Sequence, residues 1–337
     1  MSSGRRPATI VDVAARAGVS TATVSRVMSG SRGVRTASAE SVRSAARDLD
    51  YRPNVVGQTL RRQASRAVGM VVPRVDNPFF PAVVQAAEQA LRKEGYALLL
   101  CTSGDDPEVE RQVLDMLVGR QVDGLLISPC RREASRAAVV RSAARVPLVQ
   151  VDRRVDGAAC DFVGVDDARG LRDVLRHVAG AGARSVAYVG GDDSSWSGKR
   201  RHEAFLAAVK GSRRARSAGT LLGSFTAEWG REAGRRLLEG ELPDAVVCGN
   251  DLIAVGVLAA VDEARLRVPG DVLVTGFDDI GVAGLCRPGL TTVRQPVGAL
   301  TREAVRLLLA RVAEPDRPPG EALLRTTLIE RQSTLGP

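Results

Sequence analysis

Polar and aromatic side chains directly follow several short apolar runs of this 337-residue chain. Asp152 and Arg153 follow PLVQV, Asn250 follows AVVCG, and Asp278 ends VLVTGFD. If the runs are parallel strands, their carboxyl ends meet at one edge of a sheet, where α/β proteins bind ligands. Carboxylates, amides, arginines and aromatic rings together suit a polyhydroxylated or heterocyclic small molecule. A single Asp at a strand end is more often a helix cap, so the interpretation depends on the recurrence.

A second candidate site is VSTATVSRVMSG, residues 19–30, where short polar side chains lie on a helical pattern. Val24, Val27 and Met28 have the spacing of one buried helix face. The positions between them carry hydroxyls, a methyl group and an arginine, which suit the donors, acceptors and methyl groups of the DNA major groove. The alternative is a generic three-helix core with small surface residues.

Positive charge is concentrated at the N-terminal end of the chain. Residues 1–66 hold twelve arginines and four acidic residues, a net charge of +8, whereas the rest carries 36 basic and 35 acidic groups. A basic module on a nearly neutral body indicates a polyanionic partner, and double-stranded DNA is the expected one. A solvated basic tail is the alternative explanation.

Catalytic and metal-binding patterns do not stand out in the sequence. The chain has two histidines, His177 and His202, and lacks the G-x-S-x-G, P-loop and H-E-x-x-H motifs. Five scattered cysteines favour neither a disulfide framework nor a clustered zinc site, and they fit a reducing cytoplasm. We therefore expect no enzyme activity, no cofactor and no metal. A two-domain sugar or nucleotide enzyme remains an alternative, because it would share the predicted two-lobe body.

Membrane and export signals are also missing from the sequence. No apolar run approaches the roughly 18 residues of a membrane helix, and the N-terminus has no apolar signal region. We therefore expect no membrane partner. A transport-type solute-binding protein would have the same two lobes, but it would need a signal peptide and would have no use for a basic helical module.

Three short helices are predicted around the polar segment. Thr9 begins a capping-box pattern, Gly18 ends the first helix, Ser20 caps a second over about 21–28, and Ser38 starts a third. Two short helices with a tight glycine turn and a third beneath form the helix-turn-helix pattern.

The segment from Asn54 to Leu60 follows these helices and is too short for a stable isolated helix. Gly57 weakens helix formation further, by about 1 kcal/mol relative to alanine. The segment is therefore either a plain linker or a helix that forms only when docked.

From residue 68 onward, apolar runs alternate with amphipathic stretches. This pattern predicts parallel sheets covered on both faces, and its repetition predicts two doubly wound α/β lobes. We place the helix-turn-helix domain at 1–52, the hinge and linker at 53–66 and the body at 67–337. Within the body we assign 67–165 plus 292–313 to the first lobe and 166–291 plus 314–337 to the second. ALLRTTLIER, near the C-terminus, predicts one final strand.

The chain resembles the LacI/GalR family of bacterial transcription regulators along nearly its whole length. The N-terminal signature is matched in order by TIVDVAARAGVSTATVSRVMSG, VRTASAESV and LDYRPNVVGQTLRR. Family counterparts in the body include DNPFF, VPLVQVDR, RHEAF, GNDLIAVGVLAAV, VPGDVLVTGFDD and PGLTTVRQP. The resemblance implies a periplasmic-binding-protein-like body and a cytoplasmic, nucleoid-associated repressor. It would act as a homodimer on a pseudo-palindromic operator, with its affinity changed by an effector, foremost a sugar.

The resemblance also implies a role for individual residues. Thr21 and Ala22 would read the DNA sequence, and Leu60 would enter the minor groove as a kinking lever. The full DNA-contacting set would be Thr9, Thr21, Ala22, Thr23, Ser25, Arg26, Ser29, Asn54, Val56, Gln58 and Leu60. The effector would contact Asn77, Phe79, Asp152, Ser197, Arg201, Trp229, Asn250 and Asp278.

The sequence departs from the family pattern at three positions, Ala39, Gly57 and Ala204, where arginine, alanine and glycine are usual. The departure at Gly57 should weaken the coupling between hinge folding and DNA binding. The chain ends soon after Ile329 without a leucine heptad, so we expect a dimer rather than a tetramer.

Overall fold

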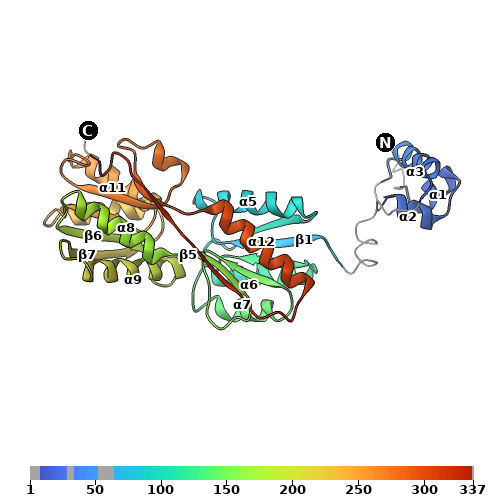
Figure 1. Ribbon diagram of the computed structural model, residues 1–337, viewed down its shortest axis with the longest axis horizontal. Coiled ribbons are helices and arrows are strands. Elements are labelled where there is room, and N and C mark those ends of the chain that lie inside the picture. Colours follow the sequence, from blue (N-terminus) through green and yellow to red (C-terminus); the bar gives the residue numbers. More distant parts are fainter. Residues whose placement is uncertain (1–7, 29–33, 52–63, 336–337) are drawn as a thin grey trace, which may run out of the picture. The chain divides into compact units, whose positions relative to one another are not determined.

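The structure is a computed structural model that describes residues 8–28, 34–51 and 64–335. The chain divides into two compact units, Met1–Ser65 and Arg66–Pro337, drawn in Figure 1. Five of the expected DNA-contacting residues lie outside the described residues, namely Ser29, Asn54, Val56, Gln58 and Leu60. Within the described ranges, no helix is long and apolar enough to cross a membrane.

The described part of the first unit, residues 8–28 and 34–51 with 64–65, contains three helices, α1 (Ile10–Ala17), α2 (Thr21–Met28) and α3 (Thr36–Asp48). They close over a small core of Val13, Ala14, Val24, Val27, Val42, Ala45 and Ala46. An ion pair of 3.4 Å between Arg16 Nη2 and Asp48 Oδ2 also links α1 to α3.

Local capping signals explain where the first two helices begin. Thr9 and Asp12 form a reciprocal capping box at α1, and Gly18 ends that helix in the left-handed conformation at φ 66°. Ser20 Oγ accepts the backbone N–H of Thr23 at the start of α2. These features confirm the predicted caps.

The prediction for the third helix was wrong at its start. Helix α3 begins at Thr36, and the preceding residue, Arg35, makes no side-chain cap. Ser38 therefore lies inside the first turn rather than at the cap.

The body contains two six-stranded sheets with helices on both faces, which confirms the predicted doubly wound lobes (Figure 1). The first sheet has the order β11-β5-β4-β3-β1-β2, and all of its pairs are parallel. Its strands are β1 (Ala67–Val72), β2 (Ala97–Thr102), β3 (Gly124–Ile127), β4 (Leu148–Val151), β5 (Asp161–Val165) and β11 (Glu321–Leu324).

The second sheet has the order β12-β10-β9-β8-β6-β7, with the edge strand β12 antiparallel to β10. Its strands are β6 (Ser185–Gly191), β7 (Arg216–Gly223), β8 (Ala245–Cys248), β9 (Leu273–Asp278), β10 (Thr291–Arg294) and β12 (Thr327–Ile329). A short 3₁₀ helix, η1 (Gly281–Gly284), follows β9.

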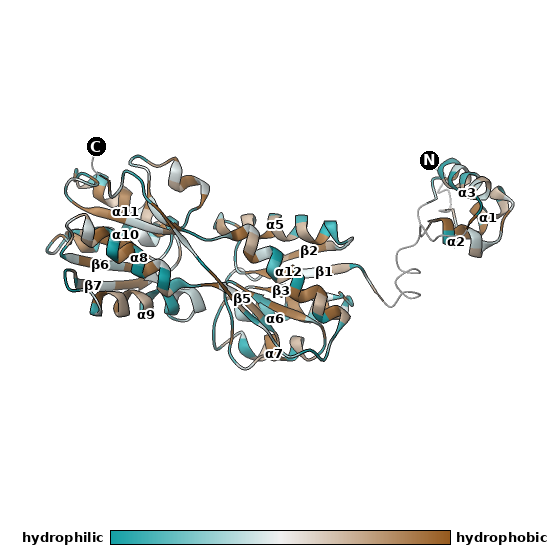
Figure 2. Ribbon diagram, viewed as in Figure 1, coloured by the Kyte–Doolittle hydropathy of each residue, from teal (hydrophilic) through white to brown (hydrophobic). Residues whose placement is uncertain are grey.

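Apolar helix faces bury both sides of each sheet. In Figure 2 the strands are largely brown, the hydrophobic colour, whereas the helices carry both brown and teal residues. The first sheet lies between α5 and α12 on one face and α6 and α7 on the other, while the second lies between α8 and α9 and between α10 and α11. The helices are α5 (Phe79–Lys93), α6 (Pro107–Gly119), α7 (Arg136–Ala143), α8 (Asp167–Gly180), α9 (Trp196–Lys210), α10 (Ala227–Leu238), α11 (Asp251–Glu263) and α12 (Val297–Ala313).

Two of the last strands belong to the opposite lobe from the one that the predicted boundaries gave them. Strand β10 (Thr291–Arg294) joins the second sheet rather than the first, and β11 (Glu321–Leu324) joins the first sheet rather than the second. The predicted single strand over ALLRTTLIER is two strands in different sheets. The chain therefore passes between the lobes three times, after β5, after β10 and after β11.

A buried ion pair holds the last return into the first sheet. Arg311 Nε on α12 donates to Asp161 Oδ2 at 2.7 Å, and the backbone N–H of Gly320 donates to Asp161 Oδ1 at 2.7 Å. The Asp161 side chain is fully buried. The pair fixes α12 and the segment before β11 against the first residue of β5.

Two glycines allow α10 and α11 to pack with their backbones in close approach. A Cβ atom on Gly256 would lie 2.0 Å from Ala227 O, and one on Gly230 would lie 2.1 Å from Ile253 O. The GNDLIAVGVLAAV helix therefore needs glycine at position 256 for packing.

Candidate DNA-contacting helix and ligand cavities

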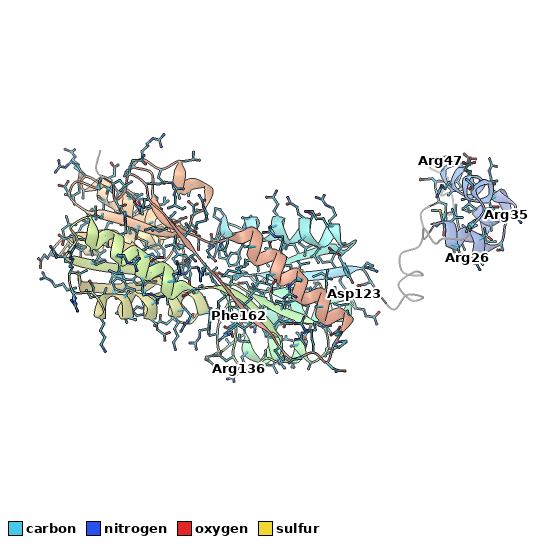
Figure 3. All side chains as sticks on the ribbon, viewed as in Figure 1. Arg26, Arg35, Arg47, Asp123, Arg136 and Phe162 are labelled. Carbon is cyan, nitrogen blue, oxygen red and sulfur yellow. The ribbon has the colours of Figure 1, made fainter. Side chains whose placement is uncertain are left out.

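Helix α2 buries its apolar face and presents its short polar face. Val24 and Val27 are buried in the three-helix core, while Thr21, Ala22 and Arg26 are exposed and Ser25 is half-buried. The structure therefore brings these four expected DNA-contacting residues onto one short helix. Figure 3 labels Arg26 together with Arg35 and Arg47, two further exposed arginines of this unit.

Two other expected DNA-contacting side chains have structural partners. The hydroxyl of Thr9 lies 2.7 Å from Asp12 Oδ2, and that of Thr23 lies 3.0 Å from Ser20 Oγ. Both threonines belong to helix caps, so their hydroxyls are already engaged in holding α1 and α2.

The strand-end residues of both lobes meet at two adjoining cavities. The first, which we call the aspartate cavity, is the smaller of the two. It is lined by Asn77, Phe79, Phe80, Asp152, Arg153, Ser197, Arg201, Phe225, Asn250 and Asp278. Seven of the eight residues expected to hold an effector are in this lining, and the exception is Trp229.

The second, which we call the arginine cavity, adjoins the first. It shares Asn77, Phe80, Arg153 and Phe225 with the aspartate cavity. Its remaining lining residues are Pro73, Arg74, Asp105, Arg131, Asp192, Ser224 and Thr226.

Trp229 lies outside this lining, half-buried against the core of the second lobe. Its indole N–H donates to Gly190 O at 3.1 Å, and its ring lies over Gly223, where an added Cβ would be 2.5 Å from the ring atoms. Phe225, two residues after β7, reaches the cavity. The expected contact with Trp229 therefore stays a prediction, and Phe225, Phe80 and Arg153 are lining residues that the expected set did not include.

Two of the polar lining residues also act as local caps. Asn250 Oδ1 accepts the N–H of Ile253 at the start of α11, and Asn77 Oδ1 accepts the N–H of Phe79 at the start of α5. The capping explanation considered for such residues is therefore correct for their oxygen atoms. Each side chain keeps its –NH₂ group as a donor to a ligand.

Arg201 organises the carboxylates of the second lobe. Its Nε lies 3.0 Å from Asp167 Oδ1, and its Nη1 lies 3.2 Å from Asp278 Oδ1 and 2.8 Å from Gly249 O. Its guanidinium carbon is 3.8 Å from the centre of the Phe277 ring. A buried arginine with these partners has a fixed orientation, so its position does not depend on a ligand.

The carboxylates of this cluster are hard to ionise. Burial raises the pKa of Asp278 to about 6, although Arg201 acts in the opposite direction. Burial likewise raises the pKa of Asp152 and Asp167, again opposed by Arg201. Ligand hydroxyls that donate to these oxygens would favour the charged form, so the cavity suits a ligand with several hydroxyl groups.

Backbone conformation places two of the carboxylates at the aspartate cavity. Asp152 has φ 64° and Asp278 has φ 106°, values that few residues other than glycine adopt. Such conformations cost on the order of 1–3 kcal/mol each and concentrate at binding sites. Their presence directly after β4 and at the end of β9 supports a binding role for this edge.

The fold and the two sites define a class of protein, a helix-turn-helix unit joined to a body that resembles periplasmic binding proteins. Residues 9–54 match the model of bacterial regulatory proteins of the lacI family, and residues 175–334 match a periplasmic binding protein-like domain. The chain belongs to the LacI family and is a DNA-binding transcription regulator.

Curated relatives in the family are transcriptional repressors. The chain is 33% identical over 311 residues to the repressor PurR of Haemophilus influenzae strain PittEE, with 92% of each chain covered. It is 33% identical over 330 residues to PurR of Pectobacterium carotovorum, with 97% of this chain and 96% of the relative covered.

Solved structures share the whole architecture. A Lac repressor dimer bound to operator and the anti-inducer ONPF has a TM-score of 0.90 and 27% identity, covering 98% of this chain and 100% of that chain. The complex of the transcriptional regulator CelR with cellobiose has a TM-score of 0.73 and 30% identity, covering 97% of this chain and 99% of that chain.

Proposed function

We propose that this protein is a homodimeric repressor whose affinity for a pseudo-palindromic operator is changed by a sugar-like effector bound between its lobes. The observation that carries the proposal is the lining of the aspartate cavity, to which both lobes contribute polar side chains. A ligand there contacts both lobes at once, so its binding depends on how the lobes are arranged.

The DNA part of the proposal is supported by α2 and by the charge of the N-terminal unit. Thr21, Ala22, Ser25 and Arg26 offer hydroxyl, methyl and guanidinium groups to base edges or phosphates. A dimer would place two such helices about one duplex turn apart. The relatives named PurR are repressors, and the Lac repressor structure is a dimer on its operator.

The effector part is supported by the donors and acceptors of the aspartate cavity. Asp152 and Asp278 accept from hydroxyls, Arg201 and the amide of Asn250 donate, and Phe79 supplies an apolar ring. This set suits a sugar better than an apolar ligand, because unpaired buried polar groups are costly. The CelR structure contains cellobiose, and the same type of ligand is expected here.

Coupling between the two sites follows from linkage. An effector changes operator affinity only by its differential affinity for two lobe arrangements, an effect of about 1–3 kcal/mol in typical allosteric proteins. The residues expected to form the DNA-contacting hinge, Asn54, Val56, Gln58 and Leu60, are part of this proposal, and Leu60→Ser should weaken specific binding far more than non-specific binding.

The test is selection of a preferred duplex from random sequence, followed by titration at fixed salt with and without a panel of sugars. Arg26→Gln should weaken binding to the selected duplex, whereas Arg136→Gln, an equal change of charge on the exposed surface of the first lobe, should not. Binding should also fall steeply with salt, because arginines contact phosphates. A full chain with no preference for any duplex over random competitor would refute the proposal.

A further inference from the structure

A buried arginine at the junction of the two cavities has no hydrogen-bonded partner among the residues that the structure describes. The Arg153 side chain is 7% exposed, and its Nε is enclosed without an acceptor. The nearest carboxylate oxygens are Asp152 Oδ2 at 3.9 Å and Asp105 Oδ1 at 4.0 Å, both beyond hydrogen-bond length. Burying a guanidinium without acceptors is costly, so this arrangement indicates a missing partner.

Aromatic rings from both lobes contact the same guanidinium. Its central carbon lies 5.4 Å from the centre of the Phe80 ring in the first lobe and 5.4 Å from that of Phe225 in the second. The rings attract the cation but supply no oxygen acceptor. The guanidinium is therefore held between two rings, with its Nε–H unpaired within the described part of the chain, at a point that lines both cavities.

The arginine cavity beyond Arg153 contains two more guanidinium groups. Arg74 is already engaged, with its Nε 2.7 Å from Asp76 Oδ1 and its Nη2 also contacting that carboxylate. Arg131 Nη1 is 3.9 Å from Asp192 Oδ2, which is beyond hydrogen-bond length. Arg131 and Arg153 thus face one space as donors, while the carboxylates of the aspartate cavity lie at its other end.

We propose that the effector carries an anionic oxygen group, a phosphate or a carboxylate, which Arg153 binds with its guanidinium fork while Arg131 adds a second contact. The hydroxyl-bearing part of the same molecule then lies among Asp152, Asp278 and Arg201. Guanidinium groups match carboxylates and phosphates in shape as well as in charge. This inference rests on the proposed function, because it names the chemical class of the effector for that site.

The first test uses inorganic phosphate and acetate as probes on the full chain, with chloride at equal ionic strength as the reference. Phosphate or acetate should raise the melting temperature of the wild type, and Arg153→Gln should lose that increase. Arg74→Gln removes the same charge from the same cavity, but it should keep the increase because Arg74 is already paired. An equal increase in the wild type and in Arg153→Gln, or none in either, would overturn the proposal.

The second test compares a neutral hexose, its 6-phosphate and the corresponding uronate by calorimetry. One anionic member should bind about tenfold or more tightly than the neutral sugar, the scale expected for charge-assisted hydrogen bonds, and its identity shows which anion the site takes. Arg153→Gln should abolish the preference, and Arg74→Gln should change it less than about threefold. A neutral hexose that binds as tightly as both anions, or a preference that survives Arg153→Gln, would contradict the inference. If no member of this panel binds, the melting-temperature changes with phosphate and acetate decide whether the inference holds.

The variant should also remain folded, because the Arg153 side chain makes no hydrogen bond within the described residues and its nearest carboxylate oxygens are 3.9 and 4.0 Å away. Operator binding measured with the same ligands separates this inference from the proposed function. A neutral sugar that changes operator affinity would leave the proposed function standing and remove the anionic class. Anion binding that depends on Arg153 but never alters operator affinity would support the anionic class and contradict the proposed function.

Discussion

Replacing Asp278 by asparagine should make the ligand-free protein more stable. Asp278 ends β9 with its carboxylate buried, where Arg201 Nη1 lies 3.2 Å away and Gln295 Nε2 donates to it at 2.7 Å. Burial nevertheless dominates, and it raises the pKa of Asp278 from 3.8 to about 6. At neutral pH the fold therefore contains a carboxylate that is less favourable there than in the unfolded chain.

The magnitude follows from the pKa difference of about two units. Each unit corresponds to about 1.36 kcal/mol, so ionised Asp278 lowers the free energy of unfolding by up to about 3 kcal/mol above pH 7. Because the folded pKa is the higher one, the stability from protonation is fully present below 3.8 and is lost as the pH rises through about 6. Asparagine has the same shape without the charge, so its advantage should grow over that window.

The assay is urea unfolding of the ligand-free full chain, followed by tryptophan fluorescence. Both tryptophans, Trp196 and Trp229, lie in the second lobe with Asp278. Asp278→Asn should raise the free energy of unfolding by up to about 3 kcal/mol at pH 7.5 but by only about 1 kcal/mol at pH 4.5. The control, Asp262→Asn on the exposed face of α11, should change the free energy of unfolding little at either pH. A variant that is less stable at pH 7.5, or equally stabilised at both pH values, would refute the reasoning. The same substitution should weaken effector binding, which would show that the site is kept at the expense of stability.

Three further substitutions test the packing of the fold. Arg311→Met leaves Asp161 buried without its cation and should lower the free energy of unfolding by about 3–5 kcal/mol, whereas Arg306→Gln on the exposed face of α12 should cost under about 1 kcal/mol in the same urea titration. Gly256→Ala forces α10 and α11 apart and should cost about 3 kcal/mol or more, seen as a lower melting temperature; a change within error would contradict the close approach. Ser20→Ala removes the cap of α2 and should cost about 1 kcal/mol, measurable by circular dichroism of the full chain as earlier loss of helix.

Local signals in the sequence were sufficient for much of the fold. The caps at Thr9 and Ser20 depend only on residues three positions apart in the sequence. Runs such as VGMVVP and AVVCGN are apolar because their strands are buried on both faces of a sheet. Strand β10 (Thr291–Arg294) lacks such a run and was not predicted as a strand. Its threonines are buried through hydrogen bonds instead, for example from Thr292 Oγ1 to Asp251 Oδ1 at 2.5 Å.

Long-range placement explains what the sequence could not predict. ALLRTTLIER has the pattern of one strand, but only the completed sheets determine that it divides at Thr326 between them. Phe225 was not among the expected contacts, because its place in the cavity lining depends on how the chain turns between β7 and α10. Arg153 was visible beside Asp152, but its missing hydrogen bonds appear only once both lobes are in place.

The interleaved strands have a consequence for synthesis on the ribosome, where the chain emerges from its N-terminus at about 5–20 residues per second. The first sheet lacks its edge strand until residue 324 has been made, and the second lacks β12 until residue 329, whereas the helical unit is complete within the first 65 residues. During elongation the nascent body thus exposes an unpaired edge of β5 from the time that strand is made until β11 follows it at residue 324. Truncation by even twenty residues would leave both sheets open, so we expect such fragments to aggregate rather than to act as smaller regulators.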